Sequence, residues 1–270
     1  MASNNAYGPQ IVTDGLVLCL DANNTKSHPG AGDTWYDLSG LGHDGLIVNT
    51  TAAAESGALV TKYFSFDGTD DGIRRDAAEK GSYDYNDSGG EFTVCVWLKP
   101  TTFASLGSNA YLAVFNRTDL SNHLHSCFLS STSGTGSYGT AGAMASWIHN
   151  TGGDNRQSSS SNAGTVTNNS VGDACVLSLD NWNFCVWRWA PFAGWRWDLF
   201  NSAGHVTATN DDNADETMRT DTTSEYRIGT WSDSYYEFTG GMSVVRQYNR
   251  KLTDAEIKRN YNALRSRFGL

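Results

Sequence analysis

Apolar and polar residues alternate in short runs along most of the chain, and this period of two is typical of β-strands. The clearest run, EFTVCVWLKP at 91–100, alternates two sets of side chains and ends at Pro100. Further strands are expected at 14–22, within 34–48 after a Gly-rich turn, and at 62–67, 110–116, 125–131, 142–149, 174–179, 182–190, 194–208 with a turn at 201–204, 226–231 and 240–249. Their number and spacing predict an all-β protein, built as a two-sheet antiparallel sandwich.

Two polar stretches separate some of these runs. Residues 151–173 are of low complexity, and they are expected to form an exposed loop because they offer little apolar surface to bury. Residues 209–225 are rich in acidic side chains. No internal repeat or linker is recognised, so residues 1–270 are predicted to form a single domain.

The pattern changes to a helical period near the C-terminus. Thr253 is a good N-cap, Glu256 completes a capping box with it, and Leu252 and Ile257 occupy the positions of a hydrophobic staple. A short amphipathic helix is therefore predicted at about 254–266. Its apolar stripe consists of Ile257, Tyr261, Leu264 and Phe268. The stripe is expected to cover the chain's own β core, or alternatively to dock on a neighbouring subunit.

Composition limits the kinds of partner. The net charge of −10 disfavours nucleic acid and anionic membranes, because both carry negative charge. No apolar run approaches the length of a membrane span, and residues 1–10 lack the features of a signal peptide. The five cysteines lie within apolar runs and are expected to be buried, reduced thiols, which fits synthesis in a cytoplasm.

Five stretches of the sequence resemble a known family: 11–45, 64–73, 92–100, 182–189 and 237–270. Together they are similar to the laminin-G-like, concanavalin A-like jelly roll found in structural proteins of tailed bacteriophages. The most specific part is the terminal motif YNRKLTDAEIKRNYNALRSRFG at 248–269. The resemblance implies two antiparallel sheets facing each other, closed by a helix near the C-terminus. The same sandwich carries glycan-binding modules, glycanases and passive shells, so the fold does not decide the function.

Carboxylates are the first candidates for chemistry. A glycanase needs two of them at a set separation, and the E-x-D-x-x-E motif of related retaining enzymes is absent, so no enzyme is predicted. Two acidic groups are expected to be solvated surface carboxylates, with calcium binding as the alternative. They are Asp70, Asp71 and Asp76 in one turn, and Asp211, Asp212, Asp215 and Glu216 in the acidic stretch. His123 and His125 share a face, but no third metal ligand is evident.

Four tryptophans form the most conspicuous cluster. Trp187 and Trp189 share one face of a predicted strand, and Trp195 and Trp197 share one face of the next. Three interpretations remain open: burial in the core, a subunit interface, and a platform for sugar rings.

The resemblance and the lack of recognisable catalytic motifs predict a non-enzymatic structural component of a phage particle, such as a decoration, fibre or appendage protein. Its partners would be other virion proteins, in a homo-oligomeric or symmetry-repeated arrangement, and it would be made in the bacterial cytoplasm and located in the virion. The alternative is a glycan-binding module for attachment to the host surface, and a glycanase is a third hypothesis. No cofactor is expected, with calcium as the alternative.

Overall fold

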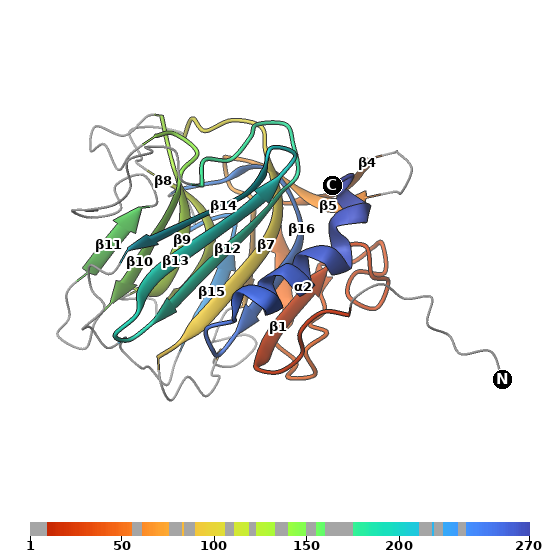
Figure 1. Ribbon diagram of the computed structural model, residues 1–270. Coiled ribbons are helices and arrows are strands. Elements are labelled where there is room, and N and C mark those ends of the chain that lie inside the picture. The colour runs from red at the N-terminus through yellow and green to blue at the C-terminus, as the bar shows by residue number, and fades with distance from the viewer. Residues whose placement is uncertain are drawn as a thin grey trace.

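The described residues of the chain form two facing antiparallel β-sheets and one short helix near the C-terminus (Figure 1). This computed structural model describes residues 10–55, 61–75, 83, 90–105, 111–118, 123–132, 140–149, 155–159, 175–210, 218, 224–231 and 236–270. The fold class predicted from the sequence, an all-β two-sheet sandwich with a C-terminal helix, is confirmed.

The first sheet holds eight strands, and every neighbouring pair is antiparallel. Both β1 and β5 pair with β16, along different parts of its length. The sheet order is β14 (Gly204–Asn210), β13 (Gly194–Asn201), β12 (Asn183–Ala190), β7 (Phe92–Pro100), β16 (Thr239–Tyr248), β5 (Thr61–Asp67) and β4 (Thr51–Glu55), with β1 (Leu16–Asp21) beside β16.

The second sheet also holds eight antiparallel strands. Their order is β11 (Asn155–Ser159), β10 (Met144–His149), β9 (His123–Ser130), β8 (Tyr111–Thr118), β15 (Glu225–Ile228), β6 (Gly72–Arg75), β3 (Gly45–Val48) and β2 (Thr34–Trp35). The chain passes repeatedly from one sheet to the other, so strands distant in sequence, such as β6 and β15, lie side by side.

Two apolar layers hold the molecule together. The main core lies between the sheets and includes the alternate residues Val94, Val96 and Leu98 of β7. A second cluster lies on the other face of the first sheet, where Trp97 and Phe184 are fully buried. One face of central strands such as β7 and β12 packs in the main core, and the other face packs in the second cluster. Residues on both faces of these strands are therefore buried.

The helix α2 (Asp254–Leu264) provides that second cover. It lies across the first sheet on the side away from the second sheet (Figure 1). A 3₁₀ turn at Arg265–Phe268 follows it, and the Phe268 ring stacks on Trp97 with centroids 4.0 Å apart. Asn260, fully buried, accepts a hydrogen bond from Val12 N (2.8 Å) and donates one to the Tyr248 hydroxyl (3.0 Å). The stripe thus covers the chain's own sheet, and the predicted capping box is present.

Two predictions about local structure were wrong. Within the stretch 151–173, expected to be an exposed loop, Asn155–Ser159 form the edge strand β11, because pairing with β10 requires only backbone groups. Of the strand expected at 174–179, the described residues 175–179 form no strand and make a single bridge, Ala143 to Val176. Cys175 has a positive φ of 61°, which takes the backbone out of the extended region there.

The five cysteines are buried and free, as predicted. No helix in the described part of the chain is both long and apolar enough to span a membrane.

Candidate functional site

A sharp turn between β5 and β6 brings three aspartates together. Gly68 has φ +82°, and a side chain there would collide with the Thr239 hydroxyl, so the turn needs glycine. Asp71 Oδ2 accepts a hydrogen bond from Asp67 N (2.6 Å). One oxygen from each of Asp67, Asp70 and Asp71 lies within 4.8 Å of the others. We call these three residues the carboxylate cluster.

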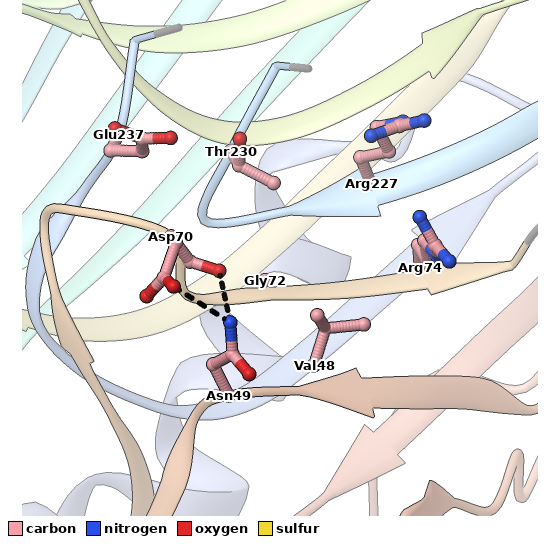
Figure 2. A pocket seen from close by; sticks show the side chains of 8 residues that line it. All are labelled: Val48, Asn49, Asp70, Gly72, Arg74, Arg227, Thr230 and Glu237. Carbon is pink, nitrogen blue, oxygen red and sulfur yellow. Dashed lines mark hydrogen bonds between the residues drawn. The ribbon is translucent and has the colours of Figure 1, made fainter. Parts of the chain in front are cut away.

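A small pocket opens beside this cluster, at the end of the second sheet where the chain turns back toward the first. Its volume is about 160 Å³, below the roughly 300–1,000 Å³ of a drug-sized site. Such a volume suits one ring or a short polar group. The lining residues are Val48, Asn49, Asp70, Gly72, Arg74, Arg227, Thr230 and Glu237 (Figure 2).

Opposite charges lie at the two ends of the pocket. Figure 2 shows Asp70 and Glu237 at one end and Arg74 and Arg227 at the other, with Thr230 between them. The strand register explains the arginine end, because Arg227 on β15 lies directly opposite Arg74 on β6. The pocket therefore offers hydrogen-bond donors at one end and acceptors at the other.

The carboxylate end contains both fixed and unsatisfied groups. Asn49 Nδ2 donates to Asp70 Oδ2 (2.9 Å) and thereby orients that carboxylate. Glu237 is only 6% exposed, and its Oε1 has no hydrogen-bond partner among the residues that the structure describes. Burial, reinforced by the carboxylates of Asp70, Asp67 and Asp71, raises the pKa of Glu237 to about 7. An unsatisfied buried carboxylate is costly, so this group is suited to bind a ligand.

The four candidate tryptophans lie elsewhere, in the core between the sheets. Trp187 faces Trp197 and Trp189 faces Trp195 across β12 and β13, and all four are fully buried. The indole N–H groups of Trp187 and Trp197 donate to Ala145 O (3.0 Å) and to Ser146 Oγ (2.8 Å) on the second sheet. They are core residues, and neither a glycan platform nor a subunit interface can be assigned to them.

The remaining candidates divide between the core and the undescribed residues. His125 is buried and stacks on Phe92 with ring centroids 4.0 Å apart, so it is a core residue, and burial lowers its pKa well below the usual value. The side chain of His123 lies outside what the structure describes. The same holds for the calcium candidates Asp76, Asp211, Asp212, Asp215 and Glu216.

Sequence reasoning identified Asp70 but missed most of the pocket. Asn49, Arg74, Arg227 and Glu237 come from four segments that only the sheet pairing brings together. The local signal was the turn sequence FDGTDDG at 66–72, in which three carboxylates follow one another closely.

The comparisons with known proteins support the fold alone. No protein-family model and no curated sequence matches the chain. The sialidase of Trypanosoma rangeli, in complex with the inhibitor DANA, has 14% sequence identity and a TM-score of 0.56 over 93% of this chain. Domain 4 of AbnA, a GH43 extracellular arabinanase from Geobacillus stearothermophilus in complex with arabinotriose, has 17% identity and a TM-score of 0.53.

These similarities differ in how much of the other protein they cover. The match covers 90% of this chain and 96% of the arabinanase domain. The binding domain of botulinum neurotoxin DC, in complex with rat synaptotagmin II, has 11% identity and a TM-score of 0.52 over 94% of this chain. The chain spans about half of that toxin domain (52%) and a third of the sialidase (33%).

Proposed function

We propose that this chain is a single non-enzymatic binding module whose pocket takes a polar ligand such as a sugar residue. The observation that carries the proposal is the separation of charge in the pocket, with two guanidinium groups facing two carboxyl groups. Sugar hydroxyls both donate and accept hydrogen bonds. At one end of the pocket the carboxylates can accept hydrogen bonds from a sugar, and the Asn49 amide can accept or donate them. At the other end the arginines can donate hydrogen bonds.

The similar folds are consistent with this proposal. The arabinanase domain was solved with arabinotriose and the toxin binding domain with a protein. β-Sandwiches thus serve as binding modules for both kinds of partner, and the polar pocket favours a glycan for this chain.

A second proposal concerns where the module works. The resemblance of five stretches of sequence to virion proteins favours a structural component of a phage particle, located in the virion and held by contacts with other virion proteins. The terminal motif of that resemblance forms the capped helix α2, which packs on its own sheet. Binding a glycan and being part of a particle are compatible roles, since a particle can carry the module to a host surface.

The pocket proposal is tested by binding of the purified chain to an array of bacterial surface glycans, followed by isothermal titration calorimetry with the best ligand. Arg74→Gln should weaken that binding at least tenfold, because it removes a guanidinium from the pocket. Lys258→Ala, on the exposed side of α2, is the control and should bind as wild type. Equal binding by both variants would exclude the pocket as the site.

The same ligands test the absence of catalysis. We expect no release of shorter oligosaccharides after prolonged incubation with the protein. Release that disappears in the Glu237→Gln variant would instead favour a glycanase. Mass spectrometry of purified particles tests the virion proposal, and absence of the protein from particles would contradict it.

A further inference from the structure

The two arginines of the pocket lie side by side on neighbouring strands. Arg227 on β15 is directly opposite Arg74 on β6, so both side chains project from the same face of the second sheet. The Cβ atoms of directly opposite residues are about 5 Å apart. Figure 2 shows both guanidinium groups at the same end of the pocket. An anionic group placed there is attracted to both guanidinium groups at once.

This arginine pair is partly removed from water and is held in place. Arg227 is 9% exposed, and Arg74 is half-buried. Glu225 Oε2, on the same strand as Arg227, lies 3.6 Å from Arg227 Nε, and this ion pair limits the directions that the guanidinium group can take. Charges interact more strongly where solvent is partly excluded. An anion bound at this end is therefore attracted more strongly than one at an open surface.

The opposite end of the pocket suits a neutral hydrogen-bonding group. Glu237 is 6% exposed, and burial, with the carboxylates of Asp70, Asp67 and Asp71, raises its pKa to about 7. At neutral pH its carboxyl group is therefore protonated in about half of the molecules, and it can then donate as well as accept a hydrogen bond. A hydroxyl group fits both protonation states, because it too donates and accepts. A cationic group fits only the ionised state.

We propose that the pocket binds an acidic sugar, with its carboxylate between Arg74 and Arg227 and its ring hydroxyls at Asp70 and Glu237. A carboxylate is planar and matches the fork of N–H donors that each guanidinium group presents. The pocket volume of about 160 Å³ suits a single ring. This proposal rests on the proposed function, since it specifies the charge of the sugar that the module binds.

The charge of the ligand is tested in two ways. The glycans that the full chain binds on the array should carry a carboxylated sugar. The methyl β-glycosides of D-glucuronic and D-galacturonic acid are then titrated by isothermal calorimetry at pH 7, beside those of D-glucose and D-galactose as uncharged counterparts. We expect an acidic glycoside to bind at least tenfold more tightly than its counterpart. Added NaCl should reduce this preference, because salt screens the charges.

Variants of the pocket identify the residues that carry the preference. Arg74→Gln and Arg227→Gln should each remove most of it, because each takes away one positive charge. Arg74→Gln is the safer of the two for folding, because Arg227 pairs with buried Glu225.

Two further variants serve as controls. Thr230→Val removes a hydroxyl group from the pocket but keeps both arginines, so the preference for acidic glycosides should remain. Lys258→Ala removes an exposed cation on α2 and controls for the change in net charge, so it should bind as wild type.

The outcomes separate this proposal from the proposed function. Binding of uncharged glycans alone, or a preference for acidic glycosides that survives both arginine substitutions, would overturn the acidic sugar and leave the pocket as a site for neutral sugars. A loss of preference in Lys258→Ala equal to that in Arg74→Gln would show that net charge, and not the arginine pair, attracts the ligand. Absence of binding both on the array and by all four glycosides would refute both proposals.

Discussion

The covered face of the first sheet and the pocket at the end of the second sheet differ in how they treat buried charge. Under α2, Arg188 is 2% exposed and donates to Leu252 O (2.7 Å), to Asp254 (2.9 Å) and to buried Asp198. In the pocket, Glu237 is 6% exposed and lies near three further carboxylates. Under α2, Arg188 thus has anionic partners, whereas in the pocket Glu237 Oε1 has no hydrogen-bond partner among the described residues.

The largest effect is expected from removing the cover. Deleting 253–270 would expose Trp97, Phe184 and Tyr248 on the outer face of the first sheet, so we expect the protein to aggregate. Aggregation of the truncated protein is measured by light scattering and by the soluble yield after expression. A soluble truncated protein with an unchanged Tm would show that α2 does not stabilise the sheet.

The inner core should be the next most sensitive region. Trp195→Ala should lower the free energy of unfolding by about 3–5 kcal/mol, because it leaves a large cavity between the sheets. Trp197→Phe should cost about 1 kcal/mol more than Trp195→Phe. The Trp197 N–H donates to Ser146, whereas that of Trp195 has no partner among the described residues. Urea denaturation of the three variants measures these differences in unfolding free energy. Curves unchanged from wild type would contradict the assignment of the tryptophans to the core.

A pair of charge removals tests the comparison directly. Arg188→Met leaves Asp198 buried without its main partner and should cost about 3–5 kcal/mol. Glu237→Gln, measured in buffer free of divalent cations, should leave the free energy of unfolding equal or higher, because it removes repulsion from the carboxylate cluster. Denaturation curves of both variants are needed, and a comparable loss in both would remove the distinction between the two regions.

Local and non-local signals explain what the sequence could predict. The helix α2 was predictable because its capping box and apolar stripe are encoded by residues three and four positions apart. The orientation of β12 was not, because Trp187 and Trp189 on one face compete with Phe184 and Val186 on the other. Both faces are buried, one by the second sheet and one by α2.

The pocket was less predictable for a different reason. Its position depends on β6 pairing with β3 on one side and β15 on the other, which brings residues near 49, 72 and 228 together. No short-range pattern records such a pairing. Only the turn at 67–71 signalled its chemistry, since three aspartates within five residues are visible in the sequence.

The capping box should contribute a smaller, pH-dependent stabilisation. Bidentate hydrogen bonds from Arg250 (2.6 and 3.0 Å), with those from Thr253, lower the pKa of Glu256 to about 2 from its ordinary value of 4.5. Its contribution is therefore complete above pH 4.5 and is lost as the pH falls toward 2. Glu256→Gln keeps the capping geometry and should cost about 1 kcal/mol at pH 7, as should Thr253→Ala.

The pH dependence of the Glu256→Gln effect serves as the control for this prediction. The difference in unfolding free energy between wild type and Glu256→Gln should shrink between pH 4.5 and pH 2, as followed by denaturation at each pH. A difference that is independent of pH would mean that the charge of Glu256 does not contribute.

The smallest effect on stability is expected in the pocket. Asn49 has a positive φ of 59°, so Asn49→Gly removes the side chain without straining the backbone, whereas Asn49→Ala would be strained. The lost bond joins two exposed residues, Asn49 and Asp70, so the unfolding free energy should change by less than about 0.5 kcal/mol. Binding of the pocket ligand should nevertheless weaken, because Asp70 is no longer oriented. A large loss of stability in Asn49→Gly would show instead that this end of the sheet is as tightly coupled to folding as the face under α2.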